Sequence, residues 1–429
     1  MNHLPSQVPT RIGPLVERLH ALYPRMMDLG LDRLQRLLAV LDHPERRLPP
    51  IVHVAGTNGK GSTCAMLRAM GEAAGWRVHV FTSPHLVHFN ERIRIAGKLV
   101  TDAQLAEAME TVERVNDGAA ITVFEVIMAA AFHLFAVHEA ELCVLEVGLG
   151  GRGDATNVIE RPAASAITSI SLDHQDLLGD TLAAIATEKA GIMRAGVPVA
   201  TGLQPPEAMA ALREAAARTG ARLLVRNEDW TIEPMNGGLR FSDARGTIDT
   251  PAPSLPGPHQ FDNAGIALAA LRAGLDVPGA AYGGLARAVW PGRLQHLDGA
   301  LADLLPKGWE LWLDGGHNPG GGAALAAHLA TWLDRPLHLV IGMKQSKDVA
   351  GFIRPLLPFA TSVWAVQEPG QHLAVTVENI MVATGGRAVP GPRVADALRQ
   401  MSGSPARVLI CGSLYLAGEV LKADGTSID

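Results

Sequence analysis

Residues 53 to 62 read His53-Val54-Ala55-Gly56-Thr57-Asn58-Gly59-Lys60-Gly61-Ser62 and join an apolar run to a helical pattern that continues to about residue 74. In such a strand–loop–helix unit, glycines let backbone N–H groups close around phosphate oxygens, and the helix start adds its positive dipole end. Lys60 adds a point charge, and the Ser62 hydroxyl is suited to Mg²⁺. The spacing differs from GxxxxGK[ST], because Gly61 separates the lysine from the serine. An ordinary glycine-rich turn is the alternative, but the context favours a phosphate-binding loop.

The alternation of apolar runs and helical patterns continues outward from this loop. Further apolar runs cover residues 78–81, 142–147 and 166–170, with helical stretches between them. This rhythm is typical of βαβ units around a mostly parallel sheet. The runs are nearly continuous, as expected for strands buried on both faces and covered by helices. Between about residues 227 and 258, short strand-like pieces lie among Asp, Gly and Pro, which predicts a small β excursion.

A second α/β domain is predicted beyond the proline–glycine break at residues 290–293. Two helical stretches, residues 261–273 and 280–289, precede the break. After it, strand-like residues 310–313, 337–341, 362–366 and 408–410 alternate with helical segments. We therefore predict an α/β protein with domains at residues 1–295 and 296–429.

Composition limits the classes of partner. The 429 residues are 48% hydrophobic, and 37 basic against 43 acidic side chains give a net charge of -6. No global basic field exists to hold a nucleic acid or an anionic membrane, so small-molecule partners are expected. The three cysteines form no CxxC pair, and the longest apolar run, residues 126–137, is shorter than the roughly 20 residues of a membrane span. With no signal-peptide pattern at the N-terminus, we expect a cytoplasmic protein.

Charged residues recur at the predicted strand ends. Glu146 ends one strand before a glycine-rich segment, Asp173-His174 is predicted to end another, and a following helix carries Glu188-Lys189. Taken singly, the Glu146 segment can equally be a strand end with a turn, while a loop histidine and a solvated helix face are the preferred readings of His174 and Lys189. Because ligands gather at the carboxyl ends of parallel strands and Mg²⁺ prefers hard oxygen ligands, we expect these residues in one crevice with the phosphate loop.

One further segment is a candidate for the site, and two other patterns are weaker signals of function. Leu313-Asp314-Gly315-Gly316-His317-Asn318-Pro319 places a carboxylate and a histidine at a strand end, although Asp-Gly and Asn-Pro also form ordinary turns. His85 and His88 lack the neighbours of a zinc site. Phe124, Phe132 and Phe135 follow the spacing of a helix core stripe, and the alternative for Phe124, near the helix start, is to face a ligand.

Together these motifs resemble, in order, those of the folylpolyglutamate synthase/dihydrofolate synthase family within the Mur ligase superfamily. The resemblance covers about position 50 to the C-terminus, and it is more specific than any one motif. The matching segments are His53 to Ser62, Thr82-Ser83-Pro84-His85-Leu86, Asn90-Glu91-Arg92-Ile93, Phe124-Glu125, Leu145-Glu146-Val147-Gly148-Leu149-Gly150-Gly151-Arg152, Asp173-His174, Thr187-Glu188-Lys189-Ala190-Gly191-Ile192, Asp262-Asn263-Ala264, Trp290-Pro291-Gly292-Arg293-Leu294 and Leu313 to Pro319. One departure is Gly316, where alanine is common.

The resemblance implies a P-loop ATPase domain joined to a smaller Rossmann-like domain, with ATP between them. It implies that Gly56, Thr57, Asn58, Gly59, Lys60, Gly61 and Ser62 bind the phosphates. Magnesium would be held by Ser62, Glu146 and His174, with K⁺ as a further candidate ion, and Lys189 resembles a lysine that is carbamylated in these ligases. Nucleotide contacts would come from Asn263, Arg293, Asp314 and His317. The pterin substrate would lie near Ser83, Pro84, His85, Arg92, Phe124 and Glu125.

The implied activity is ATP-dependent ligation of L-glutamate to dihydropteroate and to tetrahydrofolate through an acyl phosphate, with Lys60, Glu146, His174 and Lys189 as the catalytic set. The enzyme is expected to be a monomer. The alternatives are a single-activity synthase, a Mur ligase acting on a peptidoglycan precursor, and a P-loop regulator without ligase activity.

Overall fold

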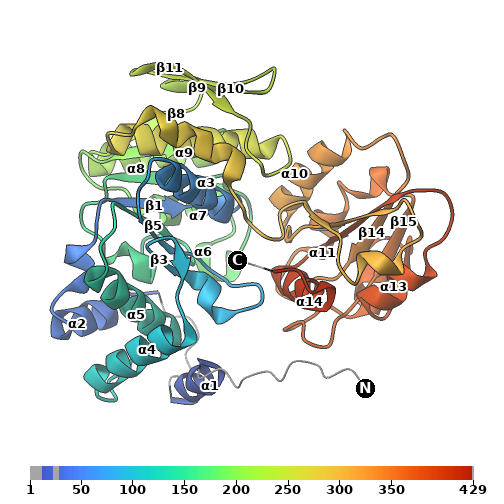
Figure 1. Ribbon diagram of the computed structural model, residues 1–429, viewed down its shortest axis with the longest axis horizontal. Helices are drawn as coiled ribbons and strands as arrows, with labels where there is room; N and C mark the ends of the chain where they lie inside the picture. The colour runs from blue at the N-terminus through green and yellow to red at the C-terminus, as the bar shows by residue number, and fades with distance from the viewer. Residues whose placement is uncertain (1–11, 23–28, 428–429) are drawn as a thin grey trace.

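The computed structural model describes residues 12–22 and 29–427, which form two α/β bodies side by side (Figure 1). The first body contains an eight-stranded sheet in the order β4-β3-β2-β5-β1-β6-β7-β8. Its strands run parallel except at the β3 and β4 edge. The strands are β1 (Ile51–Ala55), β2 (Val78–Phe81), β3 (Ile93–Ile95), β4 (Lys98–Leu99), β5 (Leu142–Glu146), β6 (Ala164–Ile167), β7 (Pro198–Thr201) and β8 (Arg222–Val225).

Alternate residues of the central strands enter different hydrophobic cores, because successive side chains of a strand point to opposite faces. Val52 and Val144 pack in one cluster, and Ile51 and Cys143 in another. Helices α3 (Lys60–Ala73) and α9 (His259–Gly274) and the 3₁₀ segment η4 (Gly279–Arg287) pack together on the first face. The second predicted helical stretch before the domain break is thus a 3₁₀ helix.

The opposite core is built by α1 (Ile12–Leu22), α2 (Asp32–Val40), α4 (Asp102–Asn116) and α5 (Val123–Val137). The starts of α4 and α5 are specified by side chains: the hydroxyls of Thr101 and Thr122 each accept a hydrogen bond from the backbone three residues on. A further core lies under α7 (Leu182–Ala190) and α8 (Pro206–Thr219). The predicted mostly parallel sheet covered by helices is confirmed.

The predicted β excursion is a three-stranded antiparallel sheet of β9 (Trp230–Met235), β10 (Gly238–Asp243) and β11 (Gly246–Pro251). It lies at the outer edge of the first body, near α9 and β8 (Figure 1). Trp230 and Phe241 stack and are buried in the α3–α9 core. The excursion contributes no residue to the cavity described below.

The second body contains a six-stranded sheet in the order β12-β13-β17-β14-β15-β16, parallel except for β12. Its strands are β12 (Gln295–Leu297), β13 (Glu310–Leu313), β14 (Leu337–Ile341), β15 (Ser362–Ala365), β16 (Ala388–Pro390) and β17 (Arg407–Cys411). Its helices are α10 (Pro319–Leu329), α11 (Val349–Ile353), α12 (Val377–Ala383), α13 (Val394–Gln400) and α14 (Leu414–Asp424). Because β12 begins at Gln295, the predicted boundary at 295/296 falls at the start of this strand.

One predicted strand boundary is wrong. β6 ends at Ile167, so Asp173 and His174 stand in the following loop rather than at the strand end. The apolar residue Ile170, which suggested a longer strand, is buried against α7 instead. In the part of the chain that the structure describes, no helix is long and apolar enough to cross a membrane.

Candidate active site

A cavity of about 960 Å³ opens between the two bodies. It is lined by the loop after β1, the ends of β2 and β5, the start of α5, and loops of the second sheet. All the residues predicted for the site, from Gly56 to His317, line this one cavity. Their proximity is therefore a property of the fold, whereas their individual roles stay predictions.

The loop between β1 and α3, the predicted phosphate loop, leads directly into the start of the helix. α3 begins at Lys60, directly after Gly59, whose φ of 91° lies in the left-handed region. The backbone N–H groups of Thr57 and Asn58 both donate to the Ser169 carbonyl, at 2.9 and 3.1 Å. Lys60 Nζ folds back onto the loop and donates to the Gly56 carbonyl at 3.1 Å. The lysine therefore stands above the loop, where an anion at the helix start would meet its charge.

Gly56 is required by space as well as by backbone conformation. Its φ is 146°, and a Cβ there would lie 1.8 Å from Thr168 Oγ1. We expect Gly56→Ala to cost about 3 kcal/mol of stability through strain and overpacking, measured as a lower thermal unfolding temperature. Gly75→Ala is the matched control, because Gly75 also has a positive φ but no atom within 4 Å of the added Cβ. Equal losses in the two variants would contradict the crowding at Gly56.

Glu146 is a buried carboxylate at the end of β5, next to the phosphate loop. Residue 146 pairs with Val54 of β1, and Glu146 Oε2 accepts one hydrogen bond, from Ser83 N at 3.2 Å. Burial raises the pKa of Glu146, and the charge of Lys60 opposes that rise. Ser62, also buried, accepts from Gln260 Nε2 at 3.4 Å. The Glu146 carboxylate and the Ser62 hydroxyl thus line the cavity together with Lys60, and their oxygens retain lone pairs that could bind a cation.

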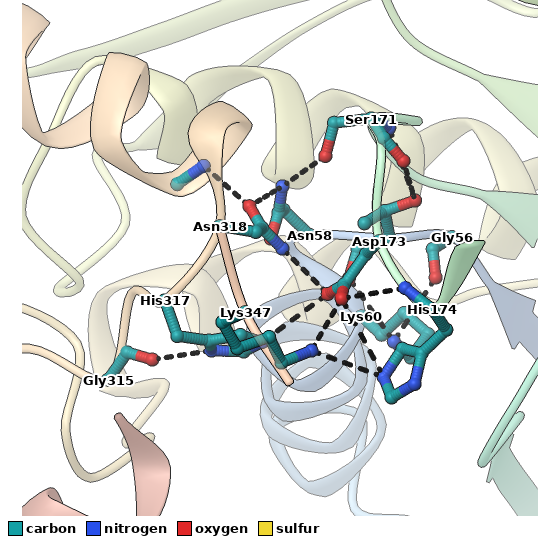
Figure 2. A network of polar contacts seen from close by, with 12 residues as sticks. Gly56, Asn58, Lys60, Ser171, Asp173, His174, Gly315, His317, Asn318 and Lys347 are labelled. Atoms are coloured by element: carbon teal, nitrogen blue, oxygen red, sulfur yellow. Dashed lines mark hydrogen bonds and ion pairs between the residues drawn. The ribbon is translucent and has the colours of Figure 1, made fainter. Parts of the chain in front are cut away.

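His174 and Asp173 lie in a polar network that joins the two bodies (Figure 2). His174 precedes the short helix α6 (Gln175–Leu178) with a φ of 51°. Its Nε2 lies 3.3 Å from Lys347 Nζ, which also donates to Asp173 Oδ1. Burial and the charge of Lys347 lower the pKa of His174 to about 4, so its imidazole is neutral at pH 7. Burial alone would raise the pKa of Asp173, but the bond to His317 and the charge of Lys347 hold it well below its ordinary value.

The second-domain motif after β13 shapes the opposite wall. Asp314 accepts from Leu294 N at 2.9 Å and from Gly316 N at 2.6 Å, so its carboxylate fixes the crossing between the bodies. His317 Nδ1 lies 2.9 Å from the Gly315 carbonyl, and its Nε2 lies 3.5 Å from Asp173 Oδ2. His317 is therefore oriented toward the phosphate-loop side of the cavity.

The residues predicted to meet the pterin line another part of the cavity, and the side chains of His85, Arg92 and Glu125 already have hydrogen-bond partners in the protein. Arg92 Nε donates to His85 Nδ1 at 2.9 Å, and burial lowers the pKa of that histidine to about 3. Phe124 lies over Gly148, where an added Cβ would meet its ring at 2.7 Å. Glu125 accepts from Thr122 N at 2.7 Å as part of the α5 cap. Its carboxylate thus also serves the local fold.

Several lining residues were not predicted from the sequence. They come from α1 and the residues before α2, and from loops and the start of α14 in the second body: Ile12, Val16, Leu29, Gly30, Lys344, Lys347, His372 and Tyr415. Lys344 and Lys347 closely follow the predicted strand 337–341, so their place after a strand end was the available signal. Nothing in the α1 sequence distinguishes a cavity wall from an ordinary amphipathic helix.

Comparisons with known proteins agree with this geometry. Residues 54–271 match the Mur ligase middle domain. The chain is 34% identical to the dihydrofolate synthase/folylpolyglutamate synthase of Escherichia coli K12, over 97% of both chains. The structure of E. coli FolC in complex with DHPP and ADP superposes with a TM-score of 0.87 at 33% identity, covering 95% of this chain and 96% of that one. A bifunctional folylpolyglutamate synthase/dihydrofolate synthase with Mn, AMPPNP and L-glutamate bound matches with a TM-score of 0.83 at 32% identity, over 95% and 97%.

A relative that is 34% identical over 97% of both chains shows the family of this chain as well as its fold. The predicted phosphate loop, the strand-end carboxylate and residues of the second body all line one cavity. The chain belongs to the dihydrofolate synthase/folylpolyglutamate synthase family within the Mur ligases, and the members of this family are ATP-dependent ligases that add glutamate.

Proposed function

We propose that one active site ligates L-glutamate to dihydropteroate and to tetrahydrofolate. The observation that carries this proposal is the single cavity of about 960 Å³, which joins the phosphate loop, the wall of Phe124 and α1, and the second-domain cations. The phosphate loop would bind the nucleotide, the wall of Phe124 and α1 the flat aromatic acid, and the second-domain cations the amino acid. Dihydropteroate and tetrahydrofolate both combine a pterin ring with a carboxylate, so the same walls of the cavity would bind either acceptor.

The chemistry proceeds in two steps. A carboxylate oxygen of the folate-type substrate attacks the γ-phosphorus of ATP, the bond to the β,γ-bridging oxygen breaks, and ADP leaves. The acyl phosphate then reacts with the glutamate amine, which loses a proton as the amide forms and phosphate leaves. Lys60 offsets negative charge on the transferring phosphoryl group, a role that is mainly positional and electrostatic. Exclusion of water by the second body protects the acyl phosphate from hydrolysis.

The residues around Lys60 fit a magnesium ion. Within residues 12–22 and 29–427, no three His, Cys, Asp or Glu side chains form a ready metal cluster. Mg²⁺ commonly uses only one or two protein oxygens and completes its shell with water and substrate phosphates. Ser62 and Glu146 would supply the oxygens, and neutral His174 a ring nitrogen. The ion would neutralise phosphate charge.

Lys189 supports a further proposal, that this residue is carbamylated. The side chain is 4% exposed, lines the cavity, and makes no hydrogen bond or ion pair with any residue that the structure describes. Burial, followed by the charge of Lys60, lowers the pKa of Lys189 to about 7. A buried amine that is partly neutral at physiological pH is the form that reacts with carbon dioxide, and a carbamate would be an oxygen ligand suited to a hard cation.

We also propose that the enzyme acts as a monomer in the cytoplasm, with K⁺ as a further candidate ion. One chain supplies all three walls of the cavity, which supports a monomer. The three cysteines are buried and free, as is usual in a reducing compartment. The net charge of -6 gives no support to nucleic acid or membrane partners.

Dual activity is tested by ADP release. We expect the purified enzyme to release ADP with dihydropteroate or with tetrahydrofolate, in each case only when glutamate is present for turnover. The reason is that both acceptors present a carboxylate to the same phosphate loop. Activity with one acceptor alone would reduce the proposal to a single synthase. Substrate-independent hydrolysis would favour a P-loop regulator, and activity with neither acceptor would reject the folate assignment.

A further inference from the structure

Asp173 is one of the points at which the two bodies are joined across the cavity (Figure 2). Its Oδ1 accepts from Lys347 Nζ, and its Oδ2 accepts from Asn318 Nδ2 at 2.9 Å. His317 Nε2 lies 3.5 Å from the same Oδ2. The Asp173 side chain is 10% exposed and that of Lys347 8%. One carboxylate therefore gathers three second-domain side chains that are far apart in sequence from it.

The network continues from Asp173 into the phosphate loop. Asn318 and Asn58 form a reciprocal amide pair, in which Asn58 Nδ2 donates to Asn318 Oδ1 at 3.1 Å and Asn318 Nδ2 donates to Asn58 Oδ1 at 3.0 Å. Asn58 also donates to Ser171 Oγ at 3.0 Å. Because Asn58 is two residues before Lys60, the position of the second body is mechanically tied to the phosphate loop.

The same contacts orient the groups around the transferring phosphoryl. Lys347 is held between Asp173 and His174, and His317 is fixed by the Gly315 carbonyl at one nitrogen and faces Asp173 with the other. Without the carboxylate, the buried ammonium of Lys347 would face Lys60 and Lys344 with no anion beside it. Asp173 therefore holds Lys347, His317 and Asn318 of the second body against the first.

We propose that Asp173 is a positioning residue that couples closure of the second domain to productive phosphoryl transfer. It acts through Lys347, His317 and Asn318. The inference rests on the proposed ligation reaction, which the unaltered enzyme tests separately in the same assay. Its distinctive consequence is that loosened closure lets water reach the acyl phosphate, so that ATP is consumed without ligation.

The first test is Asp173→Asn, which keeps the size of the side chain and removes its charge. We expect kcat for ligation to fall about 10- to 100-fold, with a smaller change in KM for ATP, because misplacement of reacting groups affects the transition state more than binding. The ratio of ADP released to glutamate ligated should rise above the value of the unaltered enzyme. Asp176→Asn is the matched control, since Asp176 is an exposed carboxylate on α6 and should leave the ratio unchanged.

Two further variants separate positioning from folding. Lys347→Met removes the ammonium, and the double variant with Asp173→Asn should lose less activity than the sum of the two single losses, because Lys347 is one of the side chains through which Asp173 acts. Asn318→Ser keeps a hydroxyl to cap α10 but lacks the amide that reaches Asp173, and it too should raise the ADP-to-product ratio. If Asp173→Asn fails to fold, the ADP-to-product ratio of Asn318→Ser tests the proposal instead. An unchanged ratio in a folded variant, or fully additive losses, would overturn the proposal.

Discussion

Replacing Lys60 with alanine is expected to abolish turnover while leaving the fold intact. Lys60 is the first residue of α3, and its ammonium donates to two carbonyls of the phosphate loop, Gly56 at 3.1 Å and Thr57 at 3.3 Å. Its loss removes the positive charge aimed at the transferring phosphoryl but little packing. Removal of one such electrostatic group commonly costs about a hundredfold or more in rate, and kcat for ADP release is the quantity to measure.

Two variants make this test specific. Lys60→Arg retains the charge but not the compact ammonium, and it should recover only part of the activity. Lys307→Ala removes an exposed lysine of the second body and should match the unaltered enzyme. Thermal unfolding of all three should be similar. Activity of Lys60→Ala within a few-fold of the unaltered enzyme would reject the phosphate-loop assignment.

The sequence could predict the fold because each central strand is a nearly continuous apolar run. Residues 51–55 and 78–81 are strands in the structure with the predicted bounds, since every side chain there is buried on one face or the other. The end of β6 was misplaced because Ile170 is apolar for a different reason, its burial beneath α7. Hydrophobicity records burial and does not distinguish a strand from a buried loop residue.

The parts of the candidate site that lie in one local motif could be predicted from the sequence. The parts that depend on contacts between residues far apart in the sequence could not. The phosphate loop and Glu146 sit directly at strand ends, so strand prediction places them together. Lys347 contacts Asp173 across 174 positions, and no spacing rule connects the two. Asp173 was visible only as a neighbour of His174. Its contacts with the second body depend on how the two sheets face each other, which local sequence patterns do not encode.

Lys189 illustrates how burial can change the chemistry of a side chain. It lies near the C-terminal end of α7, with the charges of Lys60, Asp173 and Asp154 acting on it. Its pKa of about 7 means that the neutral amine predominates above that pH and is lost as the pH falls below it. Amine and carbon dioxide combine to a carbamate with release of one proton. The modified fraction and the activity should therefore fall together below about pH 7.

Substitution of Lys189 by alanine is expected to lower ligase activity about 10- to 100-fold, as loss of a group that supports a metal ligand does, and a small carboxylate such as formate should restore part of it. Lys189→Met is the matched control, because it fills the same space, loses the same activity and leaves no room for rescue. Labelled bicarbonate should give a carbamate carbon resonance in the unaltered enzyme and none in either variant. A crystal structure with ATP and magnesium that shows an unmodified Lys189 pointing into solvent would overturn carbamylation, while the ligase assignment would still rest on the phosphate loop, Glu146 and His174.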